Sequence, residues 1–419
     1  QDNNEGNNLK SFKYVFSTGS YIDSLKVSGS VKDAFKKESE ENISVLLYKV
    51  DEAFTDSLIY KQKPNYVTNT LDSTLFEITN IEKGTYLLVA LKDRSNNYIF
   101  NPKEDKIGLH SQLITLPKDS VITDPIAIFK ETNPFRIVRS QEINKGRIIF
   151  GFEGNATNAK IEILSKTPPN FKSYYEKDFA SDTLNLWHTS IAKDSLNFKI
   201  STLDFVDTVT VHLRSKLIDS LKINSNSSRN FSLKDTLILT SNNPITKIDT
   251  SKIVFIDKDS LKVSHTFKLN KNKNKLAVLF QKKFNSSYKL TLFPNALTDV
   301  YNTKNDTLNY SFATKEPDDY GSIVLNIQKT ISEPVIIELL TEKKEELIQR
   351  FFVDKNTTLN FNLLKPGAYS IRAIIDNNNN GKWDTGSYLL KEKPEKVIYH
   401  QGLFVIKPNW EIPETFTIN

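Results

Sequence analysis

The sequence predicts an all-β fold made of tandem β-sandwich domains, and three observations support this prediction. Short stretches of alternating or continuous apolar residues recur along all 419 residues, with Asn, Asp, Ser, Gly or Pro between them. No long window keeps the 3.6-residue period of an amphipathic helix. Turn residues recur about every 8–12 positions, which is typical of Ig-like and transthyretin-like sandwiches. A chain of this length has room for several such domains.

Individual strands follow from the alternation of their side chains. Residues 208–213 alternate strictly, with Val209, Val211 and Leu213 on one face. Other segments with strand character lie at 147–152, 160–164, 197–200, 253–256 and 288–292.

An internal repeat marks two of the domains. Gly84 is followed by Tyr at +2, Ala at +6 and Asp at +9, and Gly367 is followed by the same residue types at the same offsets. A Gly turn that leads into a core strand is a local structural unit as well as a pattern. The unit resembles the transthyretin-like, carboxypeptidase-regulatory-like sandwich, in which an L-x-x-G-x-Y pattern precedes a core strand. The resemblance implies such sandwiches at 19–117 and 316–419.

A second pattern lies in residues 225–315. Tyr288 to Asp299 reads Y-x-L-x-x-x-P-x-A-L-x-D, and the segment ends on an F-x-T motif at Thr314. This order resembles the SbsA-type bacterial Ig-like domain, so we expect one at 225–315. Residues 12–18 match its tail, and we therefore expect residues 1–18 to be the last strand of a truncated N-terminal domain of the same type.

Residues 118–224 are expected to form a further Ig-like sandwich. They contain the longest segment without strand character, 165–182, and long loops on rigid sandwiches often bind ligands. Tyr174, Tyr175 and Trp187 are candidates for an aromatic platform that binds a sugar or another protein. The alternative is that the Trp belongs to the core, as it commonly does in sandwiches.

Composition excludes several classes of function. The sequence has no Cys, which rules out disulfides, thiolate metal sites and cysteine catalysis in this stretch, and no Met, so we expect translation to start before Gln1. The 48 Lys and 8 Arg are scattered over the chain, unlike the clustered Arg of nucleic-acid-binding proteins. No HExxH, GxSxG, Walker or dinucleotide motif is present, so we expect neither nucleic-acid binding nor catalysis.

One segment has the oxygen spacing of a calcium loop. Side-chain oxygens at positions 1, 3, 5 and 9 and a backbone carbonyl at position 7 would come from Asp376, Asn378, Asn380, Asp384 and Lys382. Gly381 stands at position 6, but Ser387 replaces the Glu expected at position 12, so we expect a weak Ca²⁺ site. The alternative is an Asn-rich hairpin tip that needs no ion. The equivalent loop at 93–101 lacks the Gly and is a weaker candidate.

Asp-Ser/Thr-apolar tripeptides recur more often than chance allows, although one has Thr in the third place. They resemble the O-glycosylation acceptor of exported Bacteroidota proteins, and the alternative is a turn that starts a strand. The acceptor residues would be Ser24, Ser57, Ser73, Ser120, Thr183, Ser195, Thr208, Ser220, Thr236, Ser260 and Thr307.

As a whole the chain resembles the Ig-like, SbsA-type lipoproteins of Bacteroidota. The resemblance implies an outer-membrane protein, on the cell surface or the periplasmic face, held by an N-terminal lipid anchor outside residues 1–419. We expect a non-catalytic scaffold or accessory subunit of an outer-membrane β-barrel complex for barrel assembly or nutrient uptake. A surface glycan-binding or adhesion protein and the accessory domains of a larger enzyme are the alternatives.

Overall fold

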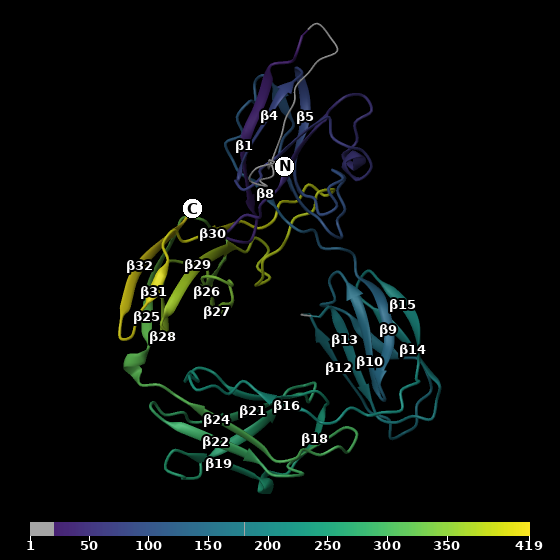
Figure 1. Cartoon of the computed structure of the whole chain (residues 1–419), viewed down its shortest axis with the longest axis vertical. Coiled ribbons are helices and arrows are strands. Elements are labelled where there is room, and N and C mark those ends of the chain that lie inside the picture. The colour runs from purple at the N-terminus through teal and green to yellow at the C-terminus, as the bar shows by residue number, and fades with distance from the viewer. Residues whose placement is uncertain (1–20, 180) are drawn as a thin grey trace, which may run out of the picture.

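The computed structural model describes residues 21–179 and 181–419, and the expected strand at 1–18 lies outside this range. Within the described residues the chain forms four β-sandwiches, each with its own apolar core, which confirms the all-β class. Figure 1 shows them arranged around a common centre, so that the last sandwich lies beside the first. In this part of the chain no helix has the length and hydropathy of a membrane span.

The first sandwich has one sheet of order β4-β1-β8 and a second of order β3-β2-β5-β6, with β7 also on β5. Its elements are β1 (Leu25–Asp33), β2 (Ser44–Lys49), the 3-10 helix η1 (Asp56–Tyr60), β3 (Tyr66–Asn69), β4 (Leu75–Ile81), β5 (Gly84–Lys92), β6 (Lys106–Leu109), β7 (Ile114–Leu116) and β8 (Ile126–Ile128).

The last sandwich repeats this topology, with sheets of order β28-β25-β32 and β27-β26-β29-β30 and with β31 also on β29. In both sandwiches the first and last strands pair in parallel. The elements of the last sandwich are η3 (Pro317–Asp319), β25 (Gly321–Lys329), β26 (Val335–Thr341), β27 (Leu347–Val353), β28 (Thr357–Leu364), β29 (Gly367–Ile375), β30 (Val397–Tyr399), β31 (Phe404–Ile406) and β32 (Glu411–Ile418).

The repeated Gly-x-Tyr motif has one structural role in both copies. The Tyr86 hydroxyl donates to the Glu82 carbonyl at 2.9 Å, and the Tyr369 hydroxyl donates to the Lys365 carbonyl at 2.7 Å. Each Tyr ring is buried and ties the turn before its strand to the core, because a buried hydroxyl needs a hydrogen-bond partner. The sequence repeat is therefore a repeat of fold.

The second sandwich pairs a sheet of order β12-β13-β10-β9 with one of order β11-β14-β15. The elements are β9 (Arg136–Asn144), β10 (Arg147–Glu153), β11 (Lys160–Ile163), β12 (Ser173–Asp178), β13 (Thr183–His188), β14 (Ser195–Ser201) and β15 (Val206–His212). Val209, Val211 and Leu213 contact one core, as their alternation predicted.

The third sandwich has sheets of order β16-β17-β21-β20 and β19-β22-β24 and a short β18-β23 pair. The elements are β16 (Ile223–Ser225), β17 (Leu237–Ser241), β18 (Ile245–Ile248), η2 (Thr250–Lys252), β19 (Ile253–Asp257), β20 (His265–Leu269), β21 (Lys275–Phe280), β22 (Ser287–Leu292), β23 (Leu297–Asp299) and β24 (Leu308–Ala313).

Three expectations about segment limits were wrong. The first sandwich extends past residue 117, because β8 at Ile126–Ile128 pairs with β1. The third begins before residue 225, because β16 starts at Ile223 and pairs with β17. The 165–182 segment is not wholly irregular, since β12 pairs along β13, and its polar alternation hid this edge strand from an apolar pattern.

Candidate functional site

The main candidate site is the junction where the first and last sandwiches meet. Phe35, in the loop after β1, lies against β29 of the last sandwich, with its ring centroid 3.9 Å from the guanidinium carbon of Arg372. The same ring lies 4.7 Å, centroid to centroid, from that of Trp383. A cation above an aromatic face is attracted by the ring quadrupole, and this attraction strengthens when water is excluded.

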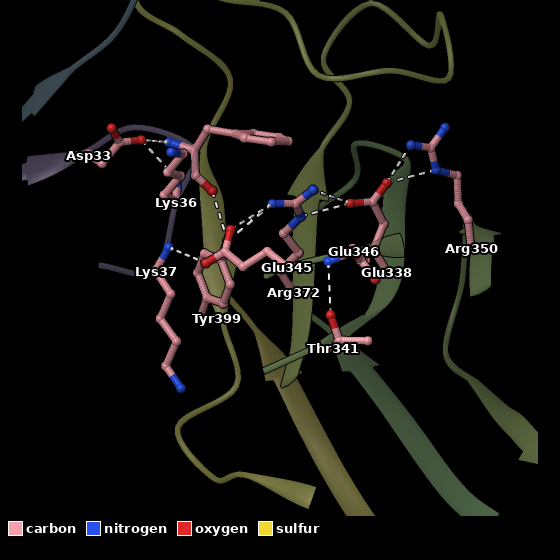
Figure 2. Close-up of polar contacts among 11 residues, drawn as sticks. Asp33, Lys36, Lys37, Glu338, Thr341, Glu345, Glu346, Arg350, Arg372 and Tyr399 are labelled. Carbon is pink, nitrogen blue, oxygen red and sulfur yellow. Dashed lines mark hydrogen bonds and ion pairs between the residues drawn. The ribbon is translucent and has the colours of Figure 1, made fainter. Parts of the chain in front are cut away.

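A row of charged side chains crosses the last sandwich at this junction (Figure 2). Glu338 is 1% exposed and accepts from Arg372, with Nε at 2.7 Å, and from the Arg350 guanidinium on the other side. Arg372 also donates to the Tyr399 hydroxyl at 3.1 Å. Two arginines thus neutralise one buried carboxylate, which makes its burial tolerable.

The junction is completed by contacts to the backbone of the first sandwich. The Tyr399 hydroxyl donates to the Phe35 carbonyl at 2.9 Å, and the Lys37 backbone N–H donates to Glu345 at 3.1 Å. Burial raises the pKa of Tyr399 to about 12, so this hydroxyl keeps its proton at neutral pH. The loop after β1 is therefore held by both a ring contact and directed hydrogen bonds.

The corresponding row in the first sandwich is apolar. Leu46 pairs with Val89 on β2 and β5, whereas Glu338 pairs with Arg372 on β26 and β29. A cluster of aromatic and aliphatic side chains covers that row, and it includes Tyr388 of the last sandwich. The two copies of one fold thus meet through an apolar face on one side and a charged row on the other.

The connection between β29 and β30 reaches onto the first sandwich. The Thr385 hydroxyl donates to the Lys130 carbonyl at 2.6 Å, and Lys391 forms an ion pair with Asp56 at 3.0 Å. Tyr388 is buried and its backbone N–H donates to Glu131 at 2.5 Å. Residues 385–391, here called the arm, join the two sandwiches independently of Phe35.

Sequence reasoning missed this junction. Its signal was the presence of single charges inside otherwise apolar strands, Glu338 in β26 and Arg372 in β29. A charge in a buried strand indicates a partner charge, but the sequence does not say which one.

The predicted calcium loop lies at the base of the arm. The Asp376 carboxylate is buried and accepts the backbone N–H groups of Asn380 at 3.0 Å and Gly381 at 2.8 Å. Glu395 accepts those of Asn377 and Asp384, at 2.8 and 3.0 Å. Gly381 has a φ of +77°, the left-handed conformation that position 6 of such a loop requires.

The side chains within the loop converge on one carboxylate. Asn378 donates to Asp384 at 2.6 Å, Asn380 also donates to it, and Lys382 contacts it at 3.1 Å. The Lys382 ammonium therefore competes with any cation at Asp384. Among the described residues no group of three His, Asp or Glu side chains is placed to hold a metal ion. A cation here would depend on amide and carbonyl oxygens.

The weaker candidate loop, at 93–101, closes in the same way. Asp93 accepts the backbone N–H groups of Ser95 and Tyr98, and Asp105 accepts those of Arg94 and Asn101. In both repeats, then, a buried acid at each end organises the loop through its backbone. This explains why the Asp at +9 recurs without requiring an ion.

The three aromatic candidates in the second sandwich do not share an exposed face. Trp187 is 2% exposed, with the guanidinium carbon of Arg147 5.3 Å from its ring centroid. Tyr174, opposite Trp187 in the β12–β13 register, lies 5.3 Å from the Lys273 ammonium of the third sandwich. The adjacent Tyr175 points to the other face and is 40% exposed.

The eleven candidate O-glycosylation residues are all at least partly exposed. None is buried, and seven are well exposed to solvent: Ser24, Ser57, Ser73, Thr208, Ser220, Ser260 and Thr307. Leu25, Leu237 and Leu308, the third residues of three tripeptides, are the first residues of β1, β17 and β24. These three tripeptides therefore lead into strands, whereas Ser57 lies in η1 and Thr208 lies within β15.

Comparison with known proteins shows similarity of fold alone. No protein-family model and no curated protein sequence matches the chain. A segment of Escherichia coli alpha-2-macroglobulin spanning domains MG0-NIE-MG1 is 13% identical over 43% of this chain and 71% of its own, with a TM-score of 0.22. Domains 4–9 of the surface-layer protein SbsC are 10% identical over 69% of this chain and 42% of their own, with a TM-score of 0.23. SGBP-B from the Bacteroides ovatus mixed-linkage glucan utilization locus, solved with a heptasaccharide, is 11% identical over 96% of this chain and 100% of its own, with a TM-score of 0.21.

Proposed function

We propose that this chain is a non-catalytic outer-membrane lipoprotein that acts as a scaffold or accessory subunit of an outer-membrane protein complex. The observation that carries this proposal is the junction of Phe35 and the arm with the far end of the chain, which fixes sandwiches that are not neighbours in sequence. A preorganised set of domains loses less conformational freedom when it binds a partner. The lipid anchor and the membrane rest on the resemblance to SbsA-type lipoproteins.

An exposed sheet edge in the last sandwich offers a surface for a partner strand. The edge strand β27 pairs with β26 on one side only. It also carries three exposed apolar side chains, Leu347, Ile348 and Phe352, the last of them 67% exposed. An edge strand with apolar side chains is suited to β-augmentation, in which a partner adds a strand to the sheet.

Copurification from detergent-solubilised outer membranes tests the proposal. The tagged, anchored protein should retain a stoichiometric β-barrel partner, and Phe352→Lys should weaken that association. Leu203→Lys is the matched control, because Leu203 is 82% exposed and lies between β14 and β15 of the second sandwich, whereas β27 belongs to the last. Recovery of the protein without any barrel partner contradicts the scaffold role.

Glycan binding is the second candidate function, favoured by the exposed Tyr175 ring on an edge strand. Polysaccharide binding that is lost in Tyr174→Ala and Tyr175→Ala, together with the absence of a barrel partner, supports it.

We further propose a weak Ca²⁺ site at the loop beginning with Asp376 and O-glycans on some of the eleven tripeptides. Mass spectrometry of the protein purified from its own cells tests the glycans.

A further inference from the structure

A recess of about 130 Å³ lies between the second and third sandwiches. Three parts of the chain form its walls: the end of the second sandwich, the linker that follows β15, and the third sandwich. The residues that line it include His188, Ile191, Leu213, Ile218 and Tyr301.

Hydrogen bonds to the backbone fix these walls in place. The Glu142 carboxylate accepts from the N–H groups of Gly146 at 3.1 Å and of Arg214 and Ser215, both at 2.8 Å. The Tyr301 hydroxyl donates to the Gly146 carbonyl at 2.8 Å. Gly146 has a φ of +84°, and a Cβ there would lie 2.7 Å from the Tyr301 ring, so only Gly fits this contact. The recess is thus preformed.

His188 is one of the residues that line this recess, and it has an unused acceptor. Its side chain is 2% exposed, and its Nδ1 lies 2.9 Å from the Thr189 carbonyl, so Nδ1 carries the proton. Its Nε2 is buried and has no hydrogen-bond partner among the described residues. Burial lowers the pKa of His188, which keeps the ring neutral and leaves a lone pair on Nε2. Phe171 stacks on the ring and holds it in place.

The residues that line the recess define the chemistry of a ligand. An unpaired acceptor calls for a group that donates a hydrogen bond, such as a hydroxyl. Ile191, Leu213 and Ile218 provide apolar walls that suit C–H groups. Lys145 and Lys193 at the recess are exposed and disfavour a cation, and Glu142 already accepts three N–H groups.

We propose that this recess binds a neutral polyhydroxyl ligand, either a polyol or one edge of a sugar residue, with His188 Nε2 accepting a ligand hydroxyl. A recess of about 130 Å³ accommodates such a group. This site is independent of the scaffold role, since it uses neither β27 nor the junction of the first and last sandwiches.

Nitrogen NMR of the full chain labelled with ¹⁵N-histidine tests the proposal. Glycerol and methyl α-glucopyranoside, each titrated to high millimolar concentration, are the probes for the two sources of hydroxyls. At least one should shift the His188 Nε2 resonance in a saturable way. His188→Phe should reduce the affinity about tenfold or more, whereas the exposed His212→Phe on β15 should leave it unchanged.

Two results overturn the site. If neither probe gives a saturable shift, the recess holds water only, and if His188→Phe binds as well as the parent chain, the hydroxyls bind elsewhere. Ile218→Trp is a second test of the site, in case His188→Phe disturbs the fold. Ile218 is 44% exposed at the recess, so a larger ring there should block binding without unfolding the sandwich.

Discussion

The guanidinium carbon of Arg372 lies 3.9 Å from the centre of the Phe35 ring and joins the first sandwich to the last. Between these residues the chain passes through two complete sandwiches. One aromatic side chain thus contributes to closing a circuit of four domains. The contribution of each contact to the docking of the two sandwiches can be measured with single substitutions.

Replacing Phe35 by Ala should loosen the junction. The variant loses a cation–π contact and the packing on Trp383, together about 1–3 kcal/mol of docking energy. The absence of native Cys allows spin labels at Lys61→Cys and Lys355→Cys, both at exposed positions, to report the distance between the two sandwiches. The distance distribution should broaden in Phe35→Ala.

Phe352→Ala is the control for this experiment, because the Phe352 ring is exposed on the same sandwich and should leave the distribution unchanged. An unchanged distribution in Phe35→Ala would show that the arm and the backbone hydrogen bonds of Phe35 and Lys37 hold the domains together without the Phe35 ring.

The two arginines beside Glu338 should differ in their effect on stability. Arg372→Met leaves a 1% exposed carboxylate without one of its two charge partners and should cost about 3–5 kcal/mol. Arg350→Met should cost only about 1 kcal/mol, because the Arg350 side chain is 37% exposed and solvent screens its charge. Denaturant unfolding measures both, and equal losses would contradict the expected difference between the buried and the exposed arginine.

Calcium should raise the melting temperature if the loop at Asp376 binds it. At a concentration ten times its Kd, the ion would add about 1.4 kcal/mol of stability. Asp384→Asn should abolish this gain, while the backbone hydrogen bonds that Asp376 accepts remain. Melting curves with millimolar Ca²⁺ and with EDTA decide the question. Identical curves for the unsubstituted chain would leave the loop as a hairpin tip closed by its own side chains.

Stability should fall as the pH drops below about 6.5, the ordinary pKa of His. Burial lowers the pKa of His188 in the folded chain, so the unfolded chain takes up that proton first. The contribution of His188 is therefore complete above pH 6.5 and declines toward acid, by at most ~1.4 kcal/mol per pH unit. The slope should flatten in His188→Phe and persist in His212→Phe. A slope that is unchanged in His188→Phe would place its origin in other groups.

The sequence alone predicted the strands in which buried and exposed side chains alternate along the chain. Strand 208–213 and the Gly-x-Tyr units are recognisable because one face of each strand contacts a core within the same hundred residues. The β12 strand escaped recognition, since it lies at a sheet edge and its exposed side chains leave no apolar alternation.

The candidate sites were predictable only in part. The spacing from Asp376 to Asp384 identified a closed loop, but the Asp376 carboxylate accepts backbone N–H groups of the same loop. The Asp384 carboxylate accepts the side-chain amides of Asn378 and Asn380. Trp187 was a candidate for an exposed ring, and the structure buries it on the outer face of its sheet under Arg147. Which residues cover a sheet face is decided by neighbouring elements and domains, and local sequence does not encode it.

By itself the sequence determined that this protein is a series of β-sandwiches in which the first and last share one design. Only the tertiary structure decided that these two sandwiches contact each other and that Glu338 pairs with Arg372 and Arg350. It also decided that His188, which has an unpaired ring nitrogen, lines a recess. The physical reason is the separation along the sequence of the residues that make each kind of contact. Strand periodicity reflects the alternation of side chains between a solvent face and the core of the same domain, whereas the docking of domains depends on single side chains separated by most of the chain.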